Sequence, residues 1–102
     1  MKERTRKKVK TIQNVILRDD RLGHAATLVD VSQSGMSVKT DHIFPTYKLI
    51  DVLIKTGGKA LQLQGSVRWV KEAPPNQTER GHEMGIAIIN PPQEFIDFFE
   101  LV

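Results

Sequence analysis

The chain has 102 residues, of which 39% are hydrophobic and 26% are charged, and none is cysteine. This length allows one domain with its own core, and the lack of cysteine excludes a disulfide framework and a thiolate metal site. No apolar run is long enough to span a bilayer, and the charged N-terminus lacks the apolar segment of a signal peptide. The composition predicts one globular domain in a reducing cytoplasm, without membrane insertion.

The net charge of +3 is distributed unevenly along the chain. Residues 1–10 contain six basic side chains and one acidic side chain, a net charge of +5, whereas the other 92 residues have a net charge of −2. We therefore divide the chain into a basic N-terminal arm, residues 1–10, and a domain over residues 11–102. The arm has two interpretations, a solvated terminus and a docking point for an anionic partner.

Six segments have the composition of β-strands, with turn-forming residues between them. The clearest one alternates apolar and polar residues from Leu61 to Trp69, which predicts one buried face and puts Trp69 in phase with the buried leucines. Six short strands joined by close turns are typical of an all-β fold, a small six-stranded antiparallel β-barrel. The predicted strands are residues 11–17, 24–31, 36–40, 48–55, 61–69 and 84–89.

Between the second and third predicted strands lies the segment Asp30-Val31-Ser32-Gln33-Ser34-Gly35. Asp and Ser side chains cap the amides of turns, and Gly adopts backbone angles that other residues avoid. On its own, this segment predicts a turn that joins the two strands.

The C-terminal residues predict one short helix. Four apolar residues recur at the spacing of a single helix face, namely Phe95, Phe98, Phe99 and Val102. Asn90 is a favourable N-cap and Pro91 a favourable first helical residue. Because so short a helix is marginal alone, we expect its phenylalanines to pack on the sheet.

No pattern in the sequence predicts an enzyme. No serine, threonine or lysine lies in a nucleophile motif, and no glycine-rich loop opens a helix to bind phosphate. The three histidines, His24, His42 and His82, are far apart in the sequence and lack the spacing of metal ligands. The sequence therefore favours a binding module without metal or cofactor.

Taken together, the basic arm, the Asp30–Gly35 segment and two later strands resemble the PilZ domain family, bacterial receptors for cyclic di-GMP built on a six-stranded barrel. The family pattern is an R-x-x-x-R arm, then D/N-x-S-x-x-G, then a Gly-x-Val-x-Trp-like strand and a Gly-Ile/Val strand before a terminal helix. Asp30, Ser32 and Gly35 fill the second motif, and residues 65–69 and 84–88 fit the two strands.

The arm departs from the family pattern. An apolar residue usually follows the second arginine, and with Val9 in that place the pair is Arg4 and Lys8, an R-x-x-x-K. The other frame, Arg6 and Lys10, also ends in lysine. Lysine binds phosphate as a point charge but cannot make the planar two-donor contact of arginine with guanine, so we expect weakened binding.

The resemblance implies a second-messenger receptor module that binds cyclic di-GMP and relays the signal to an unidentified effector protein by a conformational or interaction change. In this interpretation the Asp30 carboxylate accepts from the N1–H and N2–H groups of guanine, and Gly35 lets the backbone approach the ligand closely. The binding residues implied are Arg4, Arg6, Lys8, Asp30, Ser32 and Gly35.

Two alternatives stay open. A PilZ-like adaptor would keep the fold, bind no nucleotide and act through protein contacts. A small barrel that binds nucleic acid would use the basic arm, but such barrels present several aromatic side chains for base stacking. This chain has one Trp and one Tyr, which disfavours the nucleic-acid interpretation.

Overall fold

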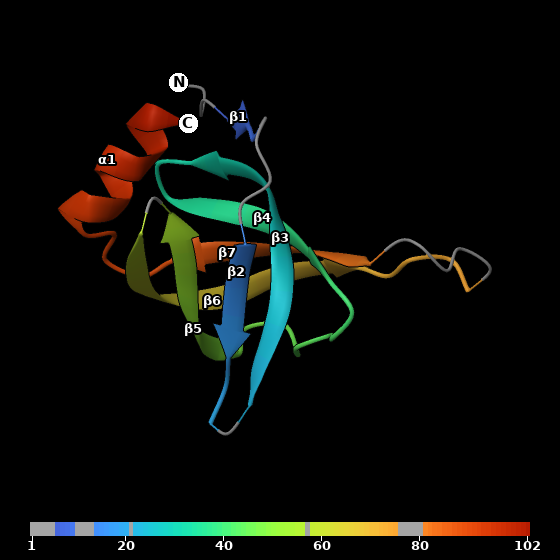
Figure 1. Ribbon diagram of the computed structural model, residues 1–102. Coiled ribbons are helices and arrows are strands. Elements are labelled where there is room, and N and C mark those ends of the chain that lie inside the picture. Colours follow the sequence, from blue (N-terminus) through green and yellow to red (C-terminus); the bar gives the residue numbers. More distant parts are fainter. Residues whose placement is uncertain (1–5, 10–13, 21, 57, 76–80) are drawn as a thin grey trace.

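The chain forms a closed six-stranded antiparallel β-barrel with one extra strand and a short C-terminal helix (Figure 1). The computed structural model describes residues 6–9, 14–20, 22–56, 58–75 and 81–102. This architecture confirms the predicted all-β barrel. Its elements are β1 (Lys7–Lys8), β2 (Asn14–Arg18), β3 (Gly23–Ser32), β4 (Gly35–Thr40), β5 (Leu49–Thr56), β6 (Lys59–Lys71), β7 (His82–Ile88) and α1 (Gln93–Leu101).

The barrel strands follow the order β3–β2–β5–β6–β7–β4, and the pairing of β4 with β3 closes the ring. Closure pairs the edge strands that an open sheet would leave exposed. The extra strand β1 belongs to the basic arm. It pairs with β3 along the same edge as β2, further toward the β3–β4 turn, with Lys7 opposite Val31 and Lys8 opposite Asp30. We did not predict β1, because consecutive lysines disfavour strands and only the neighbouring β3 provides its partner.

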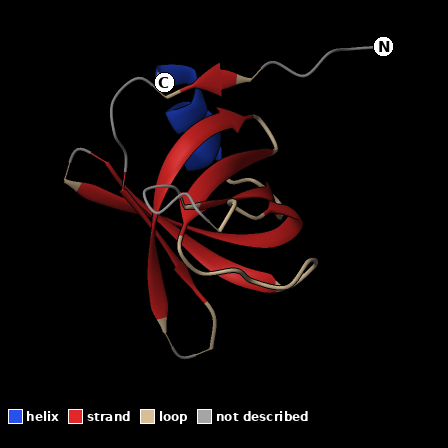
Figure 2. Ribbon diagram, turned by 90° about the vertical axis from the view of Figure 1, so that its right-hand side faces the viewer, coloured by secondary structure: helices blue, strands red, loops and turns tan. Residues whose placement is uncertain are grey.

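The core lies inside the barrel and under the helix. Inward-facing side chains from β2 to β7 fill the interior, and Phe95, Phe98 and Phe99 are buried beneath α1, as the helix pattern predicts. The helix lies at one end of the barrel, near the β3–β4 turn (Figure 2). In the part of the chain that the structure describes, no helix is long and apolar enough to cross a membrane.

The predicted start of the helix is wrong. The helix begins at Gln93, with Pro92 in an extended conformation at the N-cap and no side-chain capping bond. A proline restricts the residue before it to extended conformations, so Pro92 prevents Pro91 from opening the helix. Asn90 instead has a positive φ of 48° and turns the chain ahead of the prolines.

Two shifts of strand register change which side chains face outward. On β3 the pairs Leu28–Val38 and Asp30–Ser37 leave Val29 as an extra residue, and on β6 Arg68 is extra beside β7 in the same way. Such a bulge moves the residues after it to the opposite face.

The bulge at Arg68 corrects the prediction for Trp69. Val67 points inward and is fully buried, but Trp69 lies outside the barrel and is 41% exposed. The period-two pattern continues in the sequence through this point, whereas in the structure it is interrupted. The prediction that Trp69 shares the buried face of the leucines is therefore wrong.

Candidate functional site

A row of four directly paired residues crosses the outer face of the barrel close to the β3–β4 turn. Asp30 pairs with Ser37, Ser37 with Gly85, and Gly85 with Trp69. Directly opposed residues of antiparallel strands project to the same side of the sheet. We call these four residues the outer row, and it places a carboxylate at one end and an indole at the other.

A second row lies beside the outer row, one step nearer the turn. Its members are small and directly paired, namely Ser32, Gly35, Ala87 and Ser66. Side chains of this size leave a shallow hollow on the outer face, and its lining includes Arg6, Ser32 and Gly35 on one side and Arg68 and Trp69 on the other. The bulges at Val29 and Arg68 turn Asp30 and Trp69 outward beside it.

Two glycines allow close packing at this face, Gly35 between β4 and β7 and Gly85 beneath the Trp69 indole. A Cβ atom on Gly35 would overlap the carbonyl oxygen of Ile86 in β7, and a Cβ atom on Gly85 would overlap the Trp69 indole. On the side where a Cβ atom would lie, the space beside Gly35 is occupied by the backbone of the neighbouring strand. The pairing of β4 with β7 therefore requires glycine at position 35, whether or not a ligand binds.

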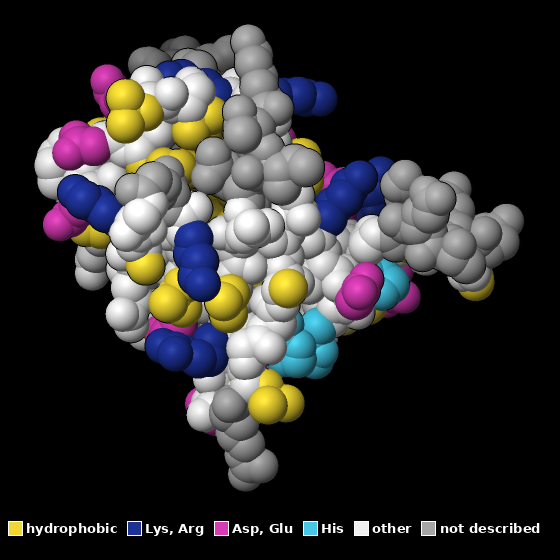
Figure 3. All heavy atoms as spheres, in the orientation of Figure 1, with side chains coloured by type: hydrophobic (Ala, Val, Ile, Leu, Met, Phe, Trp, Pro, Cys, Tyr) yellow, Lys and Arg dark blue, Asp and Glu magenta, His cyan; other side chains and the backbone are white. Residues whose placement is uncertain are grey.

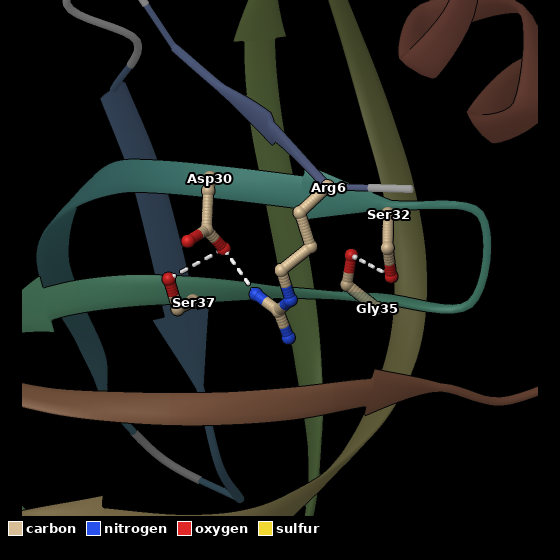
Figure 4. A network of polar contacts seen from close by, with 5 residues as sticks. All are labelled: Arg6, Asp30, Ser32, Gly35 and Ser37. Carbon is tan, nitrogen blue, oxygen red and sulfur yellow. Dashed lines mark hydrogen bonds and ion pairs between the residues drawn. The ribbon is translucent and has the colours of Figure 1, made fainter. Parts of the chain in front are cut away.

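The charged centre of the site is the Asp30 carboxylate (Figure 4). Asp30 Oδ1 accepts a hydrogen bond of 2.8 Å from Ser37 Oγ and forms an ion pair of 2.5 Å with Arg6 Nη1. Ser37 is almost fully buried, whereas the Arg6 side chain is 49% exposed. Exposed ion pairs contribute at most about 1 kcal/mol, so this pair orients the arm more than it stabilises the fold.

Ser32 lines the hollow at the end of β3. Its side chain is buried, and Oγ donates a long hydrogen bond of 3.4 Å to the carbonyl oxygen of Gly35 across the turn. This hydroxyl both tightens the turn and lines the hollow.

The basic arm is held between the outer face and the helix. The register of β1 puts Arg6 and Lys8 on the same side as Asp30, and Lys7 on the other side. Lys7 Nζ donates to the carbonyl oxygens of Phe99 and Glu100, at 3.0 and 3.4 Å, and lies 4.5 Å from the centre of the Phe99 ring. These carbonyl groups lie in the last turn of α1, where the negative end of the helix dipole favours a cation.

The structure brings together four of the six predicted binding residues, namely Arg6, Asp30, Ser32 and Gly35. Lys8 is exposed, with its backbone opposite Asp30. Arg4 lies outside the described residues, as does Lys10 of the alternative frame.

Two residues of the outer row, Ser37 and Gly85, were not predicted from the sequence. Ser37 follows Gly35 by two residues, so strand alternation could have placed it on the outer face. Gly85 could not be assigned in this way, because its place beside Ser37 and Trp69 depends on how β7 pairs with two other strands.

The closed barrel, with its polar hollow at the D-x-S-x-x-G turn, has the form of a small binding domain. The model of the PilZ domain matches residues 2–97, and the chain belongs to the PilZ domain family. This confirms the resemblance found in the sequence. No curated protein sequence matches the chain significantly.

Solved structures show the same fold. The PilZ domain of YcgR from Escherichia coli, with c-di-GMP, has a TM-score of 0.74 at 10% identity, and the match covers 97% of this chain and 86% of that one. The inhibitor of motility MotI/DgrA from Bacillus subtilis has a TM-score of 0.72 at 11% identity, and the match covers 99% of this chain. The chain spans half the length of that Bacillus protein.

Proposed function

We propose that the chain is a receptor module for cyclic di-GMP that acts in the cytoplasm and relays binding to an effector protein by a conformational or interaction change. The main support is that Arg6 and Ser32 line one hollow, with Asp30 paired to Arg6, in a member of the PilZ domain family. The YcgR domain of the same fold was solved with c-di-GMP, which makes this nucleotide the first ligand to test.

The donors and acceptors of the site suit a guanine nucleotide. Both contacts of Asp30 described above use Oδ1, so Oδ2 can accept from the N1–H and N2–H donors of guanine. The half-exposed guanidinium of Arg6 can fork onto a phosphate or onto guanine O6 and N7. Lys8 adds a point charge on the same side for a second phosphate.

The shape of the hollow suits a flat base. The small residues Ser32 and Ala87 leave room above the strands. The half-exposed indole of Trp69, which covers Gly85, borders this room and offers a surface on which a base can stack. Trp69 and Arg68 therefore join the proposed binding residues, although the sequence analysis assigned Trp69 to the core.

Ligand binding would replace an internal contact. In the free protein Arg6 is paired with Asp30, and a ligand that uses both side chains has to separate them. The neighbouring Lys7 holds the last carbonyls of α1. A shift of Arg6 toward the ligand would therefore reach the helix through one peptide unit, which gives the proposed output a physical route.

The adaptor function is the second candidate, and the same ion pair favours it. Arg6 already neutralises Asp30 without a ligand, and lysine stands in the second arm position in either frame. The nucleic-acid alternative loses one argument against it, because Trp69 is exposed and Tyr47 is exposed as well. The two candidates and this alternative predict different outcomes in one titration.

The test is a titration of the chain with cyclic di-GMP, followed by calorimetry and by the fluorescence of Trp69, the single tryptophan of the chain. We expect saturable binding with a change in Trp69 emission. In Asp30→Ala we expect a loss of affinity on the order of a hundredfold, with a decrease in unfolding free energy of no more than about 1–2 kcal/mol.

Two controls separate the alternatives. An unrelated RNA of equal charge and inorganic polyphosphate should compete poorly, because neither reproduces the guanine contacts with Asp30. Equal competition by either would identify a general anion-binding surface. If the wild-type chain binds no cyclic di-GMP, the receptor proposal is wrong and the adaptor function takes its place.

A further inference from the structure

Two histidines stack at the end of the β3–β4 hairpin that lies away from the turn. The ring centroids of His24 and His42 are 3.8 Å apart, and their planes differ by 9°. The ladder explains the contact, because His24 and His42 each lie two residues beyond the last pair of the β3–β4 ladder, Ala26 and Thr40. The spacing of the histidines in the sequence did not predict this contact. Histidine side chains reach the surface on this face of the molecule (Figure 3).

A carboxylate completes the cluster. One ligand atom from each of Asp19, His24 and His42 lies within 4.8 Å of the other two, and all three residues are half-buried. Asp19 belongs to the turn after β2, where its backbone N–H donates to the carbonyl of Leu22 at 3.3 Å and its Oδ1 accepts from the Leu22 N–H at 3.2 Å. This turn holds the carboxylate beside the two rings.

The rings rest on a rigid floor. Phe44 is almost fully buried and meets both imidazoles edge-on, with centroid distances of 5.4 Å to His24 and 4.5 Å to His42. The backbone of His42 is fixed through Thr40, whose Oγ1 accepts from the His42 N–H and donates to the Ala25 carbonyl. These contacts hold the two side chains next to each other before any ion is bound.

We propose that Asp19, His24 and His42 bind a divalent transition-metal ion of the Zn²⁺ class. Two imidazole nitrogens and one carboxylate oxygen are donors that such ions prefer, and three protein ligands leave one tetrahedral position for water. Ligand atoms in a tetrahedral zinc site are about 3.3 Å apart, whereas those of the cluster are separated by up to 4.8 Å. The stacked rings direct their nitrogens in parallel, so binding would require the rings to turn out of the stack until both nitrogens face one ion.

The proposed ion would connect three places in the fold. Asp19 lies in the turn before β3, His24 on β3, and His42 in the loop after β4. Because the cluster assembles only in the folded state, the ion would stabilise that state over the unfolded chain.

The test uses the full chain without a polyhistidine tag and ZnCl₂ as the probe. We expect one Zn²⁺ per chain by calorimetry, and a rise in melting temperature on the order of 10 °C at a hundredfold excess over Kd. Co²⁺ in place of Zn²⁺ should give the visible absorption of a tetrahedral complex. His24→Gln and His42→Gln should each weaken Zn²⁺ binding by at least about tenfold.

His82→Gln is the matched control. His82 lies outside the cluster, and its Nδ1 accepts a hydrogen bond of 3.0 Å from the Ala73 N–H. This variant should bind Zn²⁺ as the wild type does. Circular dichroism establishes that each variant is folded.

Two results would overturn the proposal. One is a wild-type chain without a zinc-dependent shift of the melt or a cobalt spectrum. The other is unchanged affinity in folded His24→Gln and His42→Gln. Binding of cyclic di-GMP should be the same in these variants as in the wild type, so failure of the metal site and failure of the receptor proposal are distinguishable.

Discussion

The two ends of the β3–β4 hairpin assemble their polar residues in different ways. At the turn end, from Asp30 to Ser37, hydrogen bonds run within the hairpin and the residues are close in the sequence. At the open end, Asp19, His24 and His42 come from three separate segments. One ladder brings Asp30 beside Ser37 at one end and His24 beside His42 at the other, but only the turn end appears in the sequence as a motif.

The bulge at Val29 connects the two ends. Without its extra residue, a hairpin with Ser32 opposite Gly35 would place Ala25, rather than His24, opposite His42. The same bulge turns Asp30 to the outer face while Val31 points inward. A single inserted residue therefore determines the composition of both clusters.

The largest expected difference between the two ends is the loss of stability when a glycine is replaced by alanine. Gly35→Ala should lower the free energy of unfolding by roughly 3 kcal/mol, because the new Cβ would overlap the backbone of β7. Gly23→Ala at the open end should change it by no more than about 0.5 kcal/mol, since its Cβ would meet only the side chain of Ile16. Urea denaturation measures both, and equal losses would contradict the packing described for the turn end.

The next effect concerns the independence of the two ends. Asp30→Ala should reduce affinity for cyclic di-GMP on the order of a hundredfold and leave Zn²⁺ binding unchanged. His42→Gln should have the reverse pattern. Calorimetry of both variants with both ligands tests this, and a loss of both ligands in one folded variant would show that the ends are coupled.

A smaller gain in affinity tests the arm. Lys8→Arg provides a planar guanidinium on the same side as Asp30, and one added two-donor contact with guanine should strengthen binding of cyclic di-GMP roughly tenfold. Lys10→Arg is the control for the other frame. We expect unchanged stability in both variants without ligand. If neither substitution strengthens binding, the arm does not read guanine through its second basic residue.

The smallest expected effect comes from breaking the contact between the arm and the helix. Only the turn end of the hairpin has such a contact among the described residues. Lys7→Met removes the donor to the carbonyls of Phe99 and Glu100 but keeps an apolar side chain beside the Phe99 ring. It should lower the free energy of unfolding by about 0.5–1 kcal/mol and speed hydrogen exchange in the last turn of α1. Lys8→Met, at an exposed position, should change neither. Unchanged exchange in Lys7→Met would rule out the proposed route to the helix.

Much of the fold follows from the sequence, because periodicity within one segment reports which side chains avoid water. The alternation from Leu61 to Val67 and the spacing of Phe95, Phe98 and Phe99 predict a buried strand face and a buried helix face, and both are confirmed. The turn motif was equally visible, since Asp30, Ser32 and Gly35 act across only six residues.

Only the tertiary structure decided what depends on contact between segments. The outward position of Trp69 depends on a bulge that forms only when β6 pairs with β7. The pairing of Arg6 with Asp30, the anchoring of Lys7 on α1 and the stacking of His24 on His42 join residues far apart in the chain. The sequence determines which side chains are available, but strand register determines which of them meet, because a shift of one residue moves a side chain to the other face of the sheet.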